Sequence, residues 1–584
     1  MNPIWKNTSR VVLIVLACFL LGMPAFAKHP KLAPDLEGVD PSSTVDVIIQ
    51  FTHVPAARHH AMVMNRGGYL KARLDVVKGA AYRIQRSQLE SLAKDSEVAY
   101  ISPDRKIAGM LDLTSAAVNA PTAWNSYGLT GTGIGVAIID SGLPYHRDLK
   151  NGRGGPRIVY QQDFTGAGAF DQYGHGGHVA GILAGNGASS TGSQFSRTFE
   201  GIAPKANLIN LRALDQNGNS TDSIVISAID EAITLQSQYN IRVINLSLGR
   251  PVYESYLQDP LCQAVEAAWM AGMVVVVAAG NDGRDNSAGT NGYGTVYAPG
   301  NDPYVITVGA MKTQGTPQRY DDLIASYSSK GPTMIDHIVK PDIVAPGNAV
   351  VSILANGASL AQTYPQTLIP MSYYVNGGSG NSPVYFMLNG TSMAAPVVSG
   401  AAALVIQQNP SLTPDQVKAR LMKTAYKSFP TSSSVTDPTT GNVYTDYYDI
   451  FTVGAGYLDI AAALANTDVA VCSASSSISA AASVSATAVA GANSASGAGC
   501  ALSPTAFFNA STGTATLVPA PSSVWNTQTL WASQTIWGAT QILDSSQTLW
   551  GCQTLWGAQT LWSQQSLWAQ TTPSDTTIVL VSGE

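Results

Sequence analysis

Residues 389–396 have the sequence Asn-Gly-Thr-Ser-Met-Ala-Ala-Pro, and small or apolar residues continue from there towards Gln408. We predict a buried helix over 393–408, with Pro396 in its first turn, where proline loses no hydrogen bond. Ser392 then lies at the helix N-terminus, where free N–H groups and the helix dipole favour negative charge. A hydroxyl there is either a helix cap or a nucleophile whose attack generates an oxyanion beside those donors. The stretch alone favours the cap.

The composition limits the classes of protein to consider. A chain of 584 residues is too long for one hydrophobic core and indicates several domains. Charged residues are 12% of the chain, about half the usual share, and with 54 glycines this is typical of a secreted, loop-rich protein. The net charge is −6, and no Lys or Arg occurs after Lys427, so the sequence does not indicate a basic surface for nucleic acid or anionic lipid.

The first 27 residues have the pattern of a signal peptide. Lys6 and Arg10 precede an apolar run over 11–22, and Ala25-Phe26-Ala27 is a small-x-small cleavage site. The run of about 12 residues is too short to span a bilayer, and no other stretch is long and apolar enough. We predict a secreted, extracellular protein, with association with the cell envelope as an alternative.

Four cysteines remain after cleavage, and their spacing bears on disulfides and metals. They are Cys262, Cys472, Cys500 and Cys552. An oxidising compartment permits a disulfide between Cys472 and Cys500. None has a CxxC neighbour, so a thiolate metal site is not expected.

Residues 45–107 have the pattern of a small α+β unit. Strands are predicted over 45–51, from 82 and over 98–104, with a helix over 87–94. The unit is either an independent domain or a pro-segment, and its place between a signal peptide and an enzyme-like region favours the pro-segment.

From Ala123 onward, strands and helices alternate. This order predicts an α/β fold, a mostly parallel sheet with helices on both faces. The predicted strands cover residues 136–139, 206–211, 243–249, 273–279, 304–309 and 342–347.

Three residues suited to acyl transfer occur in the order Asp140, His175 and Ser392. Asp140 ends a buried strand, where open α/β sheets place their sites, although a carboxylate there could equally cap a turn. A serine hydroxyl is a poor nucleophile until a histidine takes its proton, and a buried carboxylate orients that histidine. Asn281, after a Val-rich strand, is a candidate oxyanion donor or, taken alone, a turn residue. Together these residues favour a nucleophilic Ser392.

Residues 124–465 resemble a subtilisin-like serine protease, or subtilase. By this resemblance Asp140 orients the base, His175 is the general base, Ser392 is the nucleophile and Asn281 donates to the oxyanion, whereas His178 matches a histidine that is not the base. The matching segments are AIIDSG at 137–142, GHGGHVAG at 174–181, INLSLG at 244–249, VVAAGND at 276–282, SYSSKGP at 326–332, KPDIVAPG at 340–347 and NGTSMAAP at 389–396. The unit over 45–107 resembles the family's inhibitory propeptide.

The resemblance also implies where a substrate binds. Its backbone is expected to pair as an added strand, with Gly249 and its neighbours on one side and the loop over 217–219 on the other. Tyr297 corresponds to the first specificity pocket, where a bulky ring would shorten the pocket and disfavour large aromatic side chains. The substrate-binding residues so predicted are Ser247, Leu248, Gly249, Gly218, Ala279 and Gly280.

Two departures from the family pattern stand out. Gly177 replaces the usual threonine of the histidine motif, which adds backbone freedom worth about 1 kcal/mol and touches no member of the triad. The connection over 349–388 is unusually long. Its tyrosines either shape the leaving-group side of the cleft or form a surface excursion; they are Tyr364, Tyr373, Tyr374 and Tyr385.

The last part of the chain falls outside this resemblance. Ala and Ser dominate 470–522, which indicates a low-complexity linker. A six-residue repeat follows, roughly Gln-Thr-Leu-Trp-Gly/Ala-x, which predicts a β-rich tail with its tryptophans on one face. That face is either the tail's own core or a surface that binds sugars, a cell surface or another protein.

The predicted domains are a signal peptide (1–27), an inhibitory propeptide (28–110), a subtilisin-like catalytic domain (111–465), a linker (466–522) and the Trp-repeat tail (523–584). We expect a secreted serine endopeptidase that acts through an acyl-enzyme and is made as a self-processing zymogen. Its partners are protein or peptide substrates and its own propeptide, with no nucleic acid and no membrane span.

Two other classes of function are alternatives to a serine endopeptidase. A pseudoenzyme or adhesin is disfavoured by the intact set of catalytic residue types. A metallohydrolase would need a metal on His175 and His178, but the HExxH spacing is absent. No cofactor is expected for catalysis, and structural calcium, common among subtilases, has no ligand loop here that allows an assignment.

Overall fold

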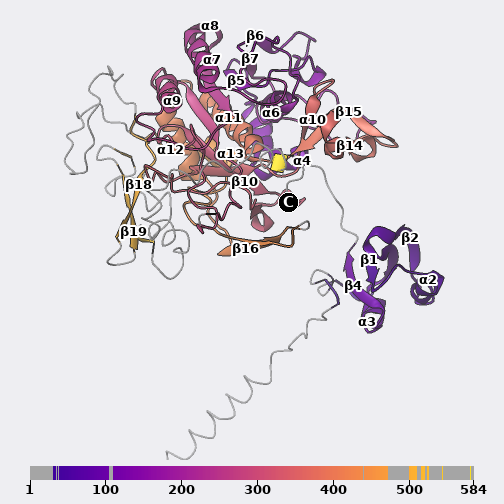
Figure 1. Ribbon diagram of the computed structural model, residues 1–584. Helices are drawn as coiled ribbons and strands as arrows, with labels where there is room; N and C mark the ends of the chain where they lie inside the picture. Colours follow the sequence, from indigo (N-terminus) through magenta and orange to yellow (C-terminus); the bar gives the residue numbers. More distant parts are fainter. Residues whose placement is uncertain are drawn as a thin grey trace, which may run out of the picture. The chain divides into compact units, whose positions relative to one another are not determined.

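The computed structural model describes residues 31–33, 36, 39–103, 110–287, 289–437, 440–470, 499–509, 514–519, 523–524, 542–543 and 579–580. The chain forms two compact units, residues 1–107 and 108–584 (Figure 1). The predicted signal peptide, most of the linker and all the repeat tryptophans lie outside the described residues. No helix among the described residues is long and apolar enough to cross a membrane.

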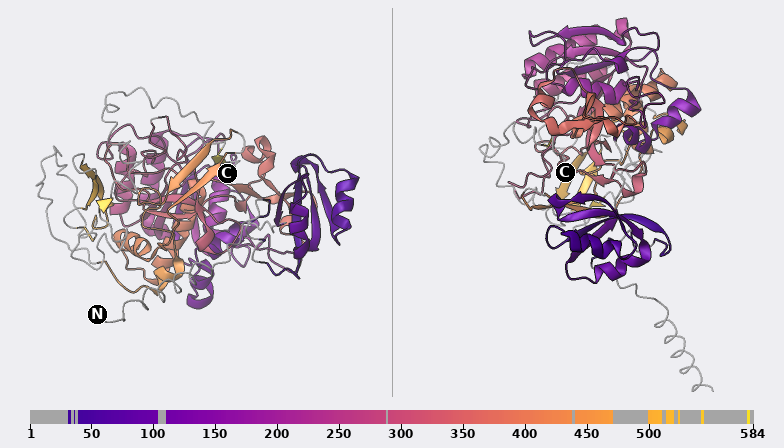
Figure 2. Two further views of the ribbon diagram at one scale, coloured as in Figure 1. Left: turned by 90° about the horizontal axis from the view of Figure 1, so that it is seen from below. Right: turned by 90° about the vertical axis from the view of Figure 1, so that its right-hand side faces the viewer.

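The first unit is an antiparallel sheet with two helices (Figure 2). Its strands lie in the order β2-β3-β1-β4, and alternate side chains of β1 are buried, which explains its period-two pattern. The elements are β1 (Thr44–Phe51), α2 (Ala57–Met64), β2 (Tyr69–Leu74), β3 (Gly79–Gln85), α3 (Leu89–Ala93) and β4 (Val98–Pro103). The predicted helix over 87–94 is a 3₁₀ turn followed by α3, and the sequence patterns missed α2 and β2.

The second unit is built on a central sheet that is parallel except for one edge strand, in the order β11-β10-β9-β8-β5-β7-β6, with β12 also paired to β10. The predicted α/β fold is therefore confirmed. The strands are β5 (Gly135–Asp140), β6 (Ile158–Asp163), β7 (Asn207–Arg212), β8 (Ile241–Leu246), β9 (Val274–Ala278), β10 (Ile306–Lys312), β11 (Leu323–Ile324) and β12 (Ile343–Pro346).

Strand β5 lies at the point where the strand order reverses, between β7 and β8. Open α/β sheets bind ligands at the carboxyl end of such a strand, because the connections on its two sides leave in opposite directions. All six residues of β5 are buried, as expected of a central parallel strand, and the last of them is Asp140.

Helices cover the central sheet in two groups. The helices α6 and α11 contact each other, and α11 packs on β8, β9 and β10. The helices α7 and α9 contact each other and pack on β5 and β9 respectively. The helices of this unit are α4 (Met110–Ala117), α5 (Ala120–Tyr127), α6 (His175–Ala184), α7 (Asp222–Thr234), α8 (Gln236–Tyr239), α9 (Pro260–Met270), α10 (Ser359–Thr363), α11 (Thr391–Gln408), α12 (Pro414–Thr424) and α13 (Ile460–Ala465).

The long connection over 349–388 forms its own antiparallel sheet, in the order β13-β15-β14. Tyr385 is fully buried, and its hydroxyl donates to Asp148 at 2.6 Å, while the ring of Tyr374 packs edge-on at 5.3 Å. These two tyrosines are core residues of the second unit, so the connection is more than a surface excursion. The strands are β13 (Val350–Ile353), β14 (Leu368–Pro370) and β15 (Asn381–Leu388).

Two smaller sheets complete the described residues. One is the hairpin of β16 (Ser432–Thr436) and β17 (Val443–Tyr447), and the other joins β18 (Thr505–Asn509), β19 (Thr514–Val518) and β20 (Ile542–Leu543). Cys500 is disulfide-bonded, and Cys472, its predicted partner, lies outside the described residues.

Candidate active site

The carboxylate at the end of β5 contacts the first residue of α6. His175 Nδ1 lies 2.8 Å from Asp140 Oδ1, which also accepts the N–H of Ser141 at 2.7 Å. The start of α6 can lie this close to the turn after β5 because residue 176 is glycine: a Cβ there would lie 2.2 Å from the carbonyl oxygen of Gly142. Asp140 is 1% exposed and His175 5%, so the pair is almost completely shielded from water.

The pKa of His175 follows from this environment. Burial alone lowers it, but the charge of Asp140, its hydrogen bond and the charge of Asp171 together outweigh burial, so the pKa of His175 is raised above its ordinary value. The Asp140 carboxylate thus stabilises the imidazolium, which is what a base needs from its partner after it has taken a proton.

A second buried carboxylate, that of Asp171, joins the turn after β5 to the start of α6. The sequence patterns did not single it out. Its Oδ1 accepts the Ser141 hydroxyl at 2.9 Å and the Gly174 N–H at 2.7 Å, and its Oδ2 accepts the Gly177 N–H at 2.7 Å. Burial raises the pKa of Asp171 to about 6, even though these hydrogen bonds lower it. The sequence did contain one signal for it: an aspartate, a residue type that often caps helices, four residues before the histidine at a predicted helix start.

Ser392 lies inside the first turn of α11 and does not cap it. The helix starts at Thr391, and the N-cap is Gly390, which has a φ of 137° and no side chain. The Ser392 hydroxyl donates to the carbonyl oxygen of Ser247 at 3.1 Å, and the Ser247 hydroxyl donates to that of Ser392 at 2.8 Å. The cap interpretation of this serine is therefore wrong, and the predicted helix starts two residues earlier than expected.

Asn281 is oriented by the same helix N-terminus. Its Oδ1 accepts the N–H of Thr391 at 3.0 Å, and an amide N–H can donate only to the oxygen of this side chain. The Nδ2 donor therefore lies at the opposite end of the amide. It faces the turn before Ser392, since a Cβ at Gly390 would lie 3.3 Å from it.

Residues 131–445 match the Subtilase family. The chain belongs to the subtilase family. It is 36% identical to serine protease AprX of Bacillus subtilis over 60% of this chain and 75% of the relative. It is 31% identical to subtilisin E of Bacillus subtilis over 70% and 92% of the two chains. It is 35% identical to an alkaline protease of Shouchella clausii over 73% and 94%. The chain is thus a serine-type peptidase, as predicted.

His178, the second histidine of the subtilase motif, is held apart from the reaction chemistry. It is completely buried, its Nε2 donates to the carbonyl oxygen of Val350 at 3.0 Å, and its ring packs edge-on to Phe386 at 5.1 Å. Burial and the neighbouring His175 lower its pKa to about 3, so it is neutral. His178 therefore joins α6 to β13 and lends no support to a metal held by the two histidines.

The glycine that departs from the family pattern has a steric explanation. A Cβ at Gly177 would lie 2.9 Å from Pro144 Cδ and 3.0 Å from Asp171 Oδ2. Pro144 is buried in the turn that follows β5. The proline thus occupies the space that a larger residue at 177 would need, and backbone freedom is the lesser effect.

The residues predicted to bind substrate lie in three short segments, after β7, β8 and β9. Leu248 and Gly249 follow β8, and among the described residues their backbone groups bond to no other segment. Gly218 lies in a tight turn with a φ of 81°, and a Cβ there would be 2.6 Å from the ring of Tyr173. Ala279 and Gly280 follow β9 and lead to Asn281.

Tyr297 fills the space next to these segments. Its N–H donates to the carbonyl oxygen of Ala279 at 2.9 Å, and its hydroxyl donates to Asp282 at 2.5 Å. An added Cβ at Gly249 or at Gly280 would lie 3.0 Å from this side chain. The tyrosine therefore lies against both glycines and is tethered at its far end.

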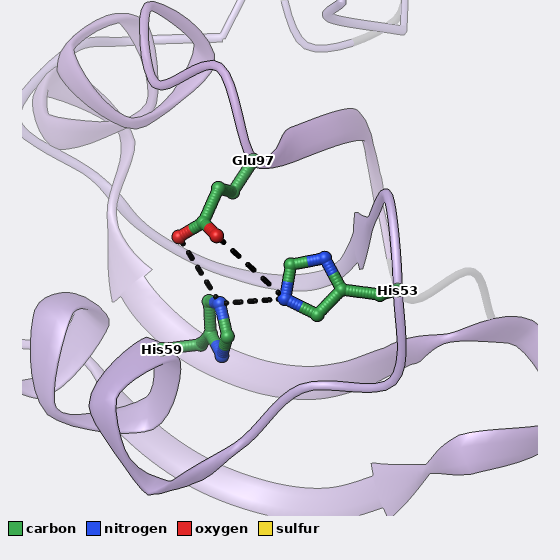
Figure 3. A group of neighbouring side chains, drawn as sticks. All are labelled: His53, His59 and Glu97. Carbon is green, nitrogen blue, oxygen red and sulfur yellow. Dashed lines mark hydrogen bonds and ion pairs between the residues drawn. The ribbon is translucent and has the colours of Figure 1, made fainter.

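One cluster in the described part of the chain has the spacing of metal ligands, and it belongs to the first unit (Figure 3). His59 Nε2 lies 3.1 Å from His53 Nε2 and 3.2 Å from Glu97 Oε2. However, His59 Nδ1 accepts the Ala56 N–H at 2.8 Å, so the neutral ring carries its proton on Nε2, the atom that would have to bind the metal. Hydrogen bonds among the three side chains account for their positions.

Proposed function

We propose that this subtilase is a secreted endopeptidase in which Ser392 is the nucleophile, His175 the general base, Asp140 the residue that orients the base and Asn281 an oxyanion donor. The observation that carries the proposal is the orientation of Asn281. Its oxygen is held by the N–H of Thr391, which leaves Nδ2 as a donor beside the N–H groups of the first turn of α11.

The proposed reaction uses these groups in turn. The Ser392 hydroxyl turns from the Ser247 carbonyl towards His175 Nε2 as substrate binds, gives up its proton and attacks the scissile carbonyl. The oxyanion is stabilised by Asn281 Nδ2 and the Ser392 N–H, the imidazolium by Asp140. His175 then protonates the leaving amine, and water hydrolyses the acyl-enzyme by the same groups.

Substrate would bind as an extended strand. The unpaired backbone of Leu248 and Gly249 offers one edge, and the turn at Gly218 offers the other. Because Tyr297 lies against Gly249 and Gly280, the first specificity pocket is shallow, and small or aliphatic residues before the cut are preferred over Phe and Tyr. Peptide-library profiling with a strong preference for Phe or Tyr would contradict this.

The N-terminal unit is proposed as the propeptide. It has its own hydrophobic core and its own sheet. A propeptide that folds first and then inhibits the protease needs both. Secretion rests on the signal-peptide pattern of residues 1–27.

The test is the Ser392→Ala variant of the full chain. We expect loss of peptide hydrolysis, of labelling by a fluorophosphonate and of the cut near residue 110. The matched control is Ser227→Ala, an exposed serine on α7, which should behave as the wild type. Hydrolysis and processing that persist in purified Ser392→Ala would overturn the proposal.

A further inference from the structure

The residues Val579 and Leu580, far along the chain from the catalytic domain, belong to the core of the second unit. Leu580 is only 7% exposed and is part of the main hydrophobic cluster, against which Val579 also packs. The Leu580 carbonyl oxygen accepts the Asn389 N–H at 3.0 Å and the Asn389 side-chain amide at 3.4 Å. One residue of the tail thus makes both an apolar and a polar contact.

The binding partner of Leu580 is a rigid part of the catalytic machinery. Asn389 is 3% exposed and joins β15 to α11, three residues before Ser392. Its Oδ1 accepts the Ala349 N–H at 2.7 Å, and the next N–H, of Gly390, donates to Gly347 at 2.8 Å. The Asn389 N–H is therefore a donor in a fixed direction next to the nucleophile.

Two different segments lead to Ser392. The acyl side runs along 247–249, which contacts Ser392 directly. On its other side Ser392 is preceded by Asn389 and β15, whose partner β13 packs on α6, the helix that begins with His175. Residues 247–249 and Asn389 thus reach Ser392 as separate segments, the first through hydrogen bonds of Ser247 and the second along the chain.

We propose that the leaving-group side of the active site runs along Asn389 and that Val579 and Leu580 are a built-in ligand of that side. There the Leu580 carbonyl takes the Asn389 N–H that the chain beyond the scissile bond would use, and its side chain fills the adjoining apolar site. The proposal rests on the proposed function, because it takes Ser392 as the nucleophile. It involves no covalent step.

The consequence is a competition that depends on the length of the substrate. A peptide with several residues after the cut must displace Leu580, whereas a substrate with a small leaving group need not. If Leu580 is docked about four-fifths of the time, the apparent affinity for long peptides falls about fivefold.

The experiment compares two substrates that share one acyl half, an internally quenched peptide with four residues after the cut and a p-nitroanilide. In the full chain, Leu580→Asp should raise kcat/KM about fivefold for the long peptide and less than twofold for the p-nitroanilide, because a charge at a buried site prevents docking. Val518→Asp is the matched control, since Val518 is 53% exposed and should change neither substrate.

A second measurement covers the case in which Leu580→Asp does not fold. A synthetic peptide of residues 575–584, added to the wild-type enzyme, should inhibit long-peptide hydrolysis competitively, and the same peptide with Asp at 580 should not. Equal effects of Leu580→Asp on both substrates, an unchanged kcat/KM for the long peptide, or no inhibition by the synthetic peptide would each overturn the inference. Activity of Ser392→Ala would instead overturn the proposed function.

Discussion

The two halves of the proposed active site are held by different forces. On one side, Asp140, Asp171 and His175 form a buried group of ionisable side chains that join β5 to α6. On the other side, Ser392 and Asn281 are positioned by neutral hydrogen bonds to the backbone at the start of α11. We call the first group the base half and the second the nucleophile half. Activity should therefore depend on pH and on charge through the base half, and on single hydrogen-bond donors through the nucleophile half.

The largest effect should come from the charge of the base half. Asp140→Asn keeps the shape of the side chain but removes the charge and favours the wrong histidine tautomer, so kcat should fall about 10⁴-fold. Steady-state kinetics of the purified variant measure this. Asp230→Asn, an exposed residue of α7, is the control and should keep full activity. A loss under tenfold in Asp140→Asn would remove Asp140 from the mechanism.

The nucleophile half should lose less when one donor is removed. Asn281→Ala deletes Nδ2 and should lower kcat about 10²- to 10³-fold with little change in KM, because the oxyanion exists only beyond the ground state. Asn376→Ala, an exposed amide, should change neither constant. A rise in KM at constant kcat would show that Asn281 binds the substrate and not the transition state.

The pH dependence should separate the two carboxylates of the base half. Because the pKa of His175 is raised, kcat/KM should rise with pH through a midpoint above the ordinary 6.5 as the base becomes neutral. Asp171 has a folded-state pKa of about 6, above its ordinary 3.8. Its contribution to stability is therefore present below about pH 4 and is lost as the pH rises through about 6.

Asp171→Asn tests that sign. The stability of the wild type relative to this variant should decrease between about pH 4 and pH 6 and stay constant above about pH 7, as thermal unfolding over this range would show. A difference that is independent of pH would mean that Asp171 does not titrate in this range.

The smallest effect concerns the contact between Gly177 and Pro144. Gly177→Thr should cost about 1–3 kcal/mol of stability, because its Cβ would overpack against the proline ring. Adding Pro144→Ala should recover part of this loss, which thermal unfolding of the single and double variants would measure. Strict additivity of the two changes would show that the residues do not compete for space.

The sequence predicted the parallel sheet, and it singled out the proposed catalytic residues, for identifiable reasons. The fully buried strands, such as β9 with its run of valines, have an unmistakable apolar pattern, and Asp140, His175 and Ser392 occur at element ends. The polar strands were missed: β2 is mostly exposed and β6 half-buried, so neither has a strong apolar signal. Asp171 was missed because its partners are backbone N–H groups and a hydroxyl.

By itself the sequence determined that this protein is a serine-type peptidase, because residue types, their order and the apolar periodicity are local properties that need no coordinates. It determined the α/β class and the subtilase family for the same reason. Only the tertiary structure decided how Ser392 is used, since the helix start at Thr391 and the contacts with Ser247 and Asn281 depend on residues more than 100 positions apart. Distant contacts also decided that Gly177 faces Pro144 and that Leu580 reaches Asn389, because packing brings together segments that no local pattern connects.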